Sequence, residues 1–127
     1  MNPRTLVLEI VTPDGPALKE SRVEAVIFRR REKRFELGSE IAVFPLHGPT
    51  LVRIPVAPAR YRKEGKTVHL AVGGGFVEVK KDRVLLVTPR FERISSAESN
   101  PLSKAKKICG KWKKEIVEFQ KEMVGYL

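Results

Sequence analysis

Apolar and polar side chains alternate through most of residues 1–94. In residues 5–11 every second position is apolar, and the same period returns in residues 23–27 and 68–72. A two-residue period is typical of a strand that buries one face and exposes the other. The runs predicted as strands or parts of strands are 5–11, 23–27, 41–44, 51–56, 59–62, 68–72, 76–79 and 84–88.

Turn-forming residues separate these runs. The segments TPDGP at 12–16, KEGK at 63–66 and KKDR at 80–83 each lie between two apolar stretches. Glycine, proline, asparagine and aspartate favour tight turns, and regular spacing of short strands is typical of an all-β sandwich or barrel. We therefore predict a mainly β fold, with a β-sandwich domain over residues 1–94 and a C-terminal α-helix.

The period changes to that of a helix in residues 95–127. Asn100 can cap a helix and Pro101 suits its first position, which predicts one long helix over residues 101–125. Apolar residues then follow at alternating spacings of three and four, as in a heptad seam. The seam consists of Leu102, Ala105, Cys109, Trp112, Ile116, Phe119, Met123 and Tyr126. Such a stripe needs a partner surface, either the β domain or another protein.

Charge narrows the possible partners. The 127 residues carry a net charge of +10, with an excess of basic groups in both parts of the chain. A basic surface attracts nucleic acid, anionic lipid or an acidic protein. Two groups stand out, a run in residues 29–34 (Arg29, Arg30, Arg31, Lys33 and Arg34) and a basic face of the tail (Lys104, Lys107, Lys111 and Lys114).

Candidate chemistry is sparse. One cysteine, Cys109, excludes an intrachain disulfide, and its place on the seam predicts packing. His47 and His69 lack the partners of a zinc or nucleophilic site. Gly73–Gly75 lacks the ending of a P-loop, so a corner between strands is expected. We expect a non-enzymatic protein without metal or cofactor, and the absence of a signal segment or a run of ~20 apolar residues favours the cytosol.

Four segments carry a resemblance to a known family. They read LEIVTPDG at 8–15, EIAVFPLHGP at 40–49, LAVGGGFVEV at 70–79 and DRVLLVT at 82–88. In this order they resemble the epsilon subunit of F-type ATP synthases over residues 5–94. The resemblance implies a ten-stranded β-sandwich followed by C-terminal helices.

The family's role supplies further expectations. The resemblance implies a rotor subunit that binds the gamma subunit and the c-ring, couples ion translocation to ATP synthesis, and needs no cofactor. Its place would be peripheral, at the cytoplasmic face of the plasma membrane. Glu40, Pro45 and His47 match the loop that faces the ring. The tail could meet the shaft or the catalytic alpha and beta subunits and restrain ATP hydrolysis.

The chain also departs from the family. Leu46 stands where glycine is usual, Gly48 stands where alanine is usual, and residues 29–40 form a longer and more basic segment. The tail has room for one helix where two are usual, and it lacks the Ile-Asp and Arg-Ala pattern with which some members bind ATP. A different class of function remains open, a basic β-sandwich that binds nucleic acid through residues 29–34 and 60–66.

Overall fold

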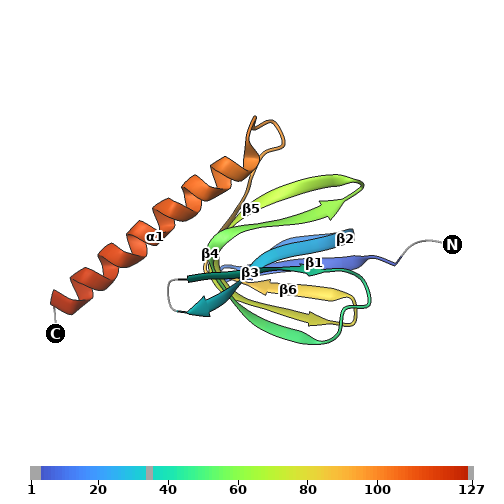
Figure 1. Cartoon of the computed structure of the whole chain (residues 1–127), viewed down its shortest axis with the longest axis horizontal. Helices are drawn as coiled ribbons and strands as arrows, with labels where there is room; N and C mark the ends of the chain where they lie inside the picture. Colours follow the sequence, from blue (N-terminus) through green and yellow to red (C-terminus); the bar gives the residue numbers. More distant parts are fainter. Residues whose placement is uncertain (1–3, 34–35, 126–127) are drawn as a thin grey trace.

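The computed structural model describes residues 4–33 and 36–125, which form seven strands and one helix. Figure 1 shows a strongly curved β domain with the helix lying against one side of it. The elements are β1 (Leu6–Thr12), β2 (Gly15–Lys33), β3 (Glu36–Val43), β4 (Thr50–Lys63), β5 (Lys66–Lys80), β6 (Arg83–Val87), β7 (Phe91–Arg93) and α1 (Pro101–Gly125). The mainly β class with one C-terminal helix is confirmed.

The strands close on themselves. Neighbouring strands follow the order β1-β6-β5-β4-β2-β3, and β1 also pairs with β2, so the first five make a closed ring. All pairs are antiparallel except β1 with β6. Because β3 pairs with β2 outside this ring and β7 pairs with β5, these two strands lie at edges.

The expected count of ten strands is wrong for the described residues. Three of the seven strands are long: β2 has 19 residues, β4 has 14 and β5 has 15. β2 pairs first with β1 and then with β3 and β4, so one strand serves both layers of the sandwich. Segments that look separate in the sequence, such as 51–56 and 59–62, are joined because pairing with β5 continues through the bends.

The three glycines at 73–75 lie inside β5, where the strand bends. Gly75 has a φ of 114°, and a Cβ built there would lie 1.9 Å from the carbonyl oxygen of Val87. Only glycine allows β6 to approach so closely at this conformation. The expected strand corner is therefore confirmed, although the strand continues through it.

Two hairpin turns have the local chemistry that the sequence predicts. Glu64 and Gly65 have φ values of 52° and 71° between the paired residues Lys63 and Lys66. In the turn from β5 to β6, Lys81 and Asp82 have φ values of 50° and 59°. Two successive positive φ values define the hairpin turn whose twist matches that of the flanking strands.

The core fills the inside of the curved sheet. Leu6, Leu8 and Ile10 of β1 are almost wholly buried, as their alternation predicts. They pack with side chains from β2, β4, β5 and β6 in one continuous apolar cluster. Burial of this cluster holds the two layers together.

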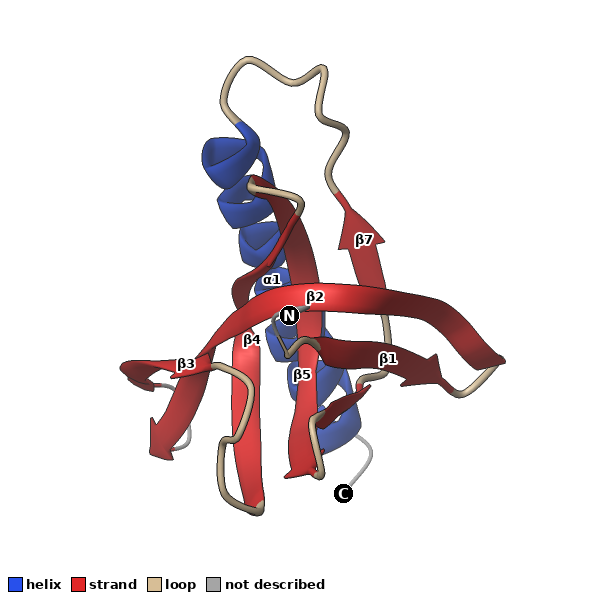
Figure 2. Ribbon diagram, turned by 90° about the vertical axis from the view of Figure 1, so that its right-hand side faces the viewer, coloured by secondary structure: helices blue, strands red, loops and turns tan. Residues whose placement is uncertain are grey.

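The helix begins where the sequence predicts. The side-chain oxygen of Asn100 accepts a hydrogen bond from the backbone N–H of Ser103 at 3.1 Å, and Pro101 is the first helical residue. Figure 1 shows α1 beside the sheet, and Figure 2 shows it behind β4 and β5. No helix in residues 4–33 and 36–125 is both long and apolar enough to cross a bilayer.

Candidate functional site

His47 lies in a tight turn between β3 and β4. Its backbone N–H donates to the carbonyl of Phe44 at 3.2 Å, which closes a four-residue turn with Pro45 at its second position. Leu46, at the third position, has a φ of 70°. Proline followed by a residue of positive φ is the pattern of a type II turn, in which the third residue is usually glycine. A glycine at position 46 would adopt this conformation without strain, whereas the leucine does not.

A carboxylate from a distant turn holds this loop in place. Asp82 accepts a hydrogen bond from the backbone N–H of Leu46 at 2.7 Å, and its other oxygen accepts from Arg4 at 2.6 Å. These two donors, the Leu46 N–H first, keep the pKa of the Asp82 carboxyl below its usual value. The His47 loop is thus fastened to the β5–β6 turn. Sequence analysis missed Asp82 because its partners lie far away along the chain.

The His47 ring is held by its neighbours. Its Nδ1 lies 2.8 Å from the carbonyl oxygen of Gly48, and the hydroxyl of Thr50 lies 3.4 Å from the same nitrogen. The hydroxyl of Thr50 also donates to the carbonyl of Gly48 at 3.0 Å. These contacts orient the ring within the loop and leave it half-buried.

The structure does not bring Glu40 and His47 together. Glu40 lies within β3 opposite Arg29 of β2, and not in the loop where we expected it. Its carboxylate accepts a hydrogen bond from Arg60 of β4 at 2.6 Å, which lowers its pKa. The expectation of a shared loop fails because β3 continues its pairing with β2 past Glu40 to Val43. Glu40 is therefore already paired within the sheet.

The basic segment extends the β2–β3 hairpin. Arg29, Arg30 and Arg31 are exposed at the end of β2, and Arg29 donates to the carbonyl of Gly38 at 3.3 Å. Lys33 is the last residue of β2, and Arg34 lies outside the described residues. Arg29, Arg31 and Lys33 are thus paired with β3, and this hairpin lies at the opposite end of β3 from the His47 loop (Figure 1).

Within the described part of the chain, the apolar seam of the tail is buried only between Ala105 and Trp112. Ala105, Cys109 and Trp112 are buried, and the last two pack with Ala71 of β5 and Val56 of β4. Burial raises the pKa of the Cys109 thiol, in keeping with a packing role. The seam residues Leu102, Ile116, Phe119 and Met123 are exposed, and Tyr126 lies outside the described residues.

One arginine fastens the middle of the helix. The guanidinium of Arg90 stacks over the ring of Trp112 and donates to the carboxylate of Glu115 at 2.7 Å. We call this arrangement the Arg90 clamp. Sequence analysis missed it, since nothing in the local pattern links residue 90 to the helix. The lysines of the predicted basic face, Lys104, Lys107, Lys111 and Lys114, are all exposed.

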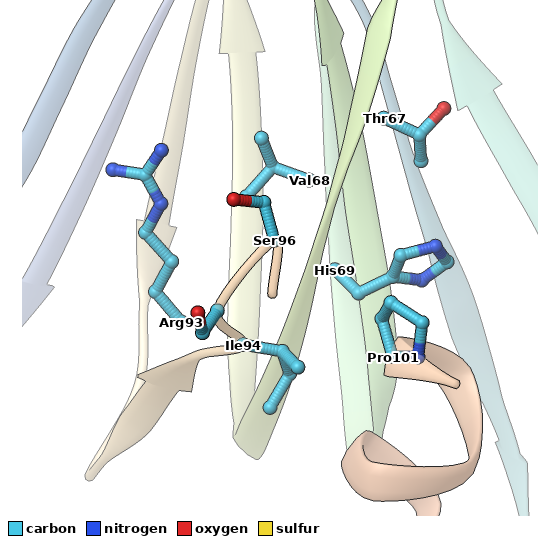
Figure 3. A pocket seen from close by; sticks show the side chains of 8 residues that line it. Thr67, Val68, His69, Arg93, Ile94, Ser96 and Pro101 are labelled. Atoms are coloured by element: carbon cyan, nitrogen blue, oxygen red, sulfur yellow. The ribbon is translucent and has the colours of Figure 1, made fainter. Parts of the chain in front are cut away.

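A shallow pocket of about 300 Å³ lies where the helix begins (Figure 3). Its lining comes from β5, from Arg93 of β7 with the linker that follows it, and from Pro101. Burial, with the charge of Arg60 nearby, lowers the pKa of His69, and the buried Nδ1 of this ring lacks a hydrogen-bond partner among the described residues. Sequence analysis did not single out this junction.

Known proteins resemble this chain in sequence. A family model described as the β-sandwich domain of the ATP synthase delta/epsilon chain matches residues 5–94. The ATP synthase epsilon chain of Bacillus cytotoxicus is 31% identical over 104 residues, which are 82% of this chain and 73% of that protein. The epsilon chain of Bacillus licheniformis is 36% identical over 89 residues, covering 70% of this chain and 63% of that protein. These matches favour the rotor-subunit hypothesis over nucleic-acid binding.

Solved structures resemble the fold. A chain of the Euglena gracilis mitochondrial ATP synthase, in the cryo-EM structure of OSCP, F1 and c-ring, matches with a TM-score of 0.63 and 24% identity. That match covers 81% of this chain and 62% of the other. A chain of the central stalk and c-ring of the Tetrahymena thermophila mitochondrial ATP synthase matches with a TM-score of 0.57 and 14% identity, over 93% and 95% of the two chains.

Proposed function

Because this chain belongs to the ATP synthase delta/epsilon chain family, we propose that it is the epsilon subunit in the rotor of an F-type ATP synthase. The observation that carries the proposal is the match of the family's β-sandwich domain to residues 5–94, nearly the whole described β domain. As part of this complex the chain is associated with a membrane. It would lie at the cytoplasmic face of the plasma membrane, bind gamma and the c-ring, and help couple ion flow to ATP synthesis.

The proposed role is binding without catalysis. The His47 ring hydrogen-bonds within its own turn, the backbone N–H of Leu46 donates to Asp82, and Glu40 pairs with Arg60. Those contacts shape a surface that can be held rigidly against a partner. Rigid presentation is what a rotor component needs, because a contact that yields under torque cannot transmit it.

The tail would supply regulation. Its outer lysines are exposed. Among the described residues, the apolar side chains that follow Trp112 on the seam are exposed as well, so they can pack against another surface. The helix could leave the sandwich for the shaft, where Lys107, Lys111 and Lys114 would meet acidic segments of the catalytic subunits. A contact of this kind restrains hydrolysis only if it differs between rotary states.

The test of the assignment is co-purification. A tagged full-length chain, expressed in its own organism, should bring gamma and the c-ring out of gently solubilised membranes. Recovery of the chain without either subunit, at native expression level, would count against the rotor assignment.

The regulatory part has its own test. The triple variant Lys107→Glu, Lys111→Glu and Lys114→Glu should raise ATP hydrolysis by the assembled complex, more clearly at low salt where screening is weaker. A matched control reverses Lys19 and Lys66, two exposed lysines of the β domain. Unchanged hydrolysis in an intact complex would show that the tail does not restrain catalysis.

A further inference from the structure

The basic β2–β3 hairpin extends beyond the rest of the sheet. β2 pairs with β4 only as far as Ile27, whereas its pairing with β3 continues to Lys33. Phe28 is the last residue of β2 in the apolar core. Residues 29–33 therefore belong to a two-stranded ribbon at the side of the β domain, which Figure 2 shows beside the label β3.

This ribbon contributes little to the packing of the sandwich. Arg29, Arg30 and Arg31 are exposed, so these three positions of β2 add nothing to the apolar core. A two-stranded ribbon that packs on nothing is only marginally stable in water. A paired segment kept outside the core therefore favours a role in contact with another surface.

The charges of the hairpin do not cancel. Residues 29–40 contain five basic and three acidic side chains. One of the three, Glu40, pairs with Arg60 of β4, outside the hairpin. Arg30 and Arg31 take part in no ion pair among the described residues. Positive charge is thus available at the hairpin for an anionic partner.

The arginines lie on both faces of the ribbon. Successive residues of a strand point to opposite faces, so Arg30 lies on one face and Arg29 and Arg31 lie on the other. A folded protein partner would meet one face, whereas a layer of lipid headgroups can surround both. Arginine also binds phosphate groups through two parallel N–H donors. The arrangement therefore favours the headgroups of anionic phospholipids over an acidic protein surface.

We propose that Arg29, Arg30 and Arg31, which we call the hairpin arginines, bind the headgroups of anionic phospholipids at the membrane surface. The anionic headgroups of a membrane attract basic side chains that lie close to its surface. The contact adds a lipid anchor to the protein contacts of the rotor. This inference rests on the proposed function, because assembly into a membrane-associated complex is what brings the hairpin near lipid.

The test measures sedimentation of the full-length chain with lipid vesicles. Wild type should bind vesicles of phosphatidylcholine and phosphatidylglycerol in a ratio of about three to one, and it should bind pure phosphatidylcholine far more weakly. Binding to the anionic vesicles should weaken as the salt concentration rises. The triple variant Arg29→Gln, Arg30→Gln and Arg31→Gln should lose about tenfold or more of its affinity for the anionic vesicles.

Two further variants separate the charge of the hairpin from the net charge of the chain and from folding. Lys19→Gln, Arg22→Gln and Lys66→Gln together remove the same charge from exposed positions elsewhere in the β domain. This control variant should bind the anionic vesicles within about threefold of wild type. Replacing all three hairpin arginines with lysine keeps the charge, and this variant should also bind within about threefold of wild type.

Each remaining outcome overturns a definite statement. If the glutamine variant binds like wild type, or if the control variant loses as much affinity as the glutamine variant, the hairpin is not the lipid site. If the lysine variant binds as weakly as the glutamine variant, the charge of the hairpin does not hold the vesicles and the proposal fails. If wild type ignores the vesicles but binds a glutamate-rich peptide through the hairpin arginines, the partner is an acidic protein and the lipid contact is wrong. The rotor assignment stands in all these cases, since it fails only if gamma and the c-ring do not co-purify with the chain.

Discussion

The guanidinium of Arg90 lies 4.5 Å from the ring centroid of Trp112. Trp112 is the last buried residue of the helical seam among the described residues, and Ile116, Phe119 and Met123 after it are exposed. The Arg90 clamp therefore marks the point at which the helix stops packing on the sandwich. Because few contacts hold the helix on the sandwich, loss of the contact between Arg90 and Trp112 should measurably weaken the docking of the helix.

Loss of the clamp should loosen the helix. Arg90→Ala removes the stacking on Trp112 and the pair with Glu115, which together stabilise docking by about 1 kcal/mol because both groups are partly exposed. We expect the emission of Trp112, the chain's single tryptophan, to shift to longer wavelength, and trypsin to cut the helix faster. Arg30→Ala, on the exposed hairpin, is the control. An unchanged emission spectrum in Arg90→Ala would contradict the clamp.

Leu46→Gly should stabilise the fold. It relieves the positive φ and removes a side chain that is mostly exposed, so the free energy of unfolding should rise by about 0.5–1 kcal/mol after the greater freedom of glycine in the unfolded chain is counted. Thermal unfolding should then occur about 2–5 °C higher. Leu51→Gly, within β4, is the matched control and should lower the midpoint. A lower midpoint for Leu46→Gly would mean that the leucine packs in a way that its exposure does not indicate.

Two glycines should respond oppositely to alanine. At Gly75 the added Cβ meets the Val87 carbonyl, and the φ of 114° disfavours any side chain, so Gly75→Ala should cost about 3 kcal/mol or more. At Gly110, inside α1, a Cβ meets nothing within 4 Å, and Gly110→Ala should stabilise the helix by about 1 kcal/mol. Urea unfolding of the two variants measures both effects. Equal stabilities would refute the assigned bend at Gly75.

The half-buried side chain of His69 predicts a pH dependence of stability. Burial lowers the pKa of His69, whereas in the unfolded chain it returns to its ordinary value of about 6.5. The unfolded state then binds more protons, so the contribution of His69 to stability is complete above about pH 6.5 and is lost as pH falls through the lowered pKa. The unfolding midpoint should drop more between pH 7.5 and 5.0 in wild type than in His69→Gln. Parallel pH profiles of the two proteins would exclude this role.

The sandwich should fold without the tail. We propose a domain boundary near residues 94–95, where β7 has ended and the linker to α1 begins. A chain ending at Ser96 should keep β-type circular dichroism and unfold cooperatively. Its stability should fall by on the order of 3 kcal/mol, because Val56 and Ala71 lose the apolar cover of Trp112 and its neighbours. Non-cooperative unfolding would show that the helix is an integral part of the β domain.

The sequence by itself determined the local structure. The alternation of Leu6, Leu8 and Ile10 predicted the buried face of β1, and Asn100 with Pro101 predicted the start of α1. The turns at residues 63–66 and 80–83 followed from their composition. Each of these features depends on interactions within a few residues, so the side chains present are enough to specify it. The four short segments 8–15, 40–49, 70–79 and 82–88 likewise sufficed to indicate the family.

Only the tertiary structure decided how these pieces meet. The heptad spacing is the same before and after Trp112, yet the seam is buried from Ala105 to Trp112 and exposed at Ile116, Phe119 and Met123, because the β4–β5 surface covers only part of the helix. The pairing of Glu40 with Arg60, and of Asp82 with the Leu46 N–H, depends on the register of strands far apart in sequence. These contacts need strands that are not neighbours in the sequence to lie side by side, and a pattern within a few residues does not specify that arrangement.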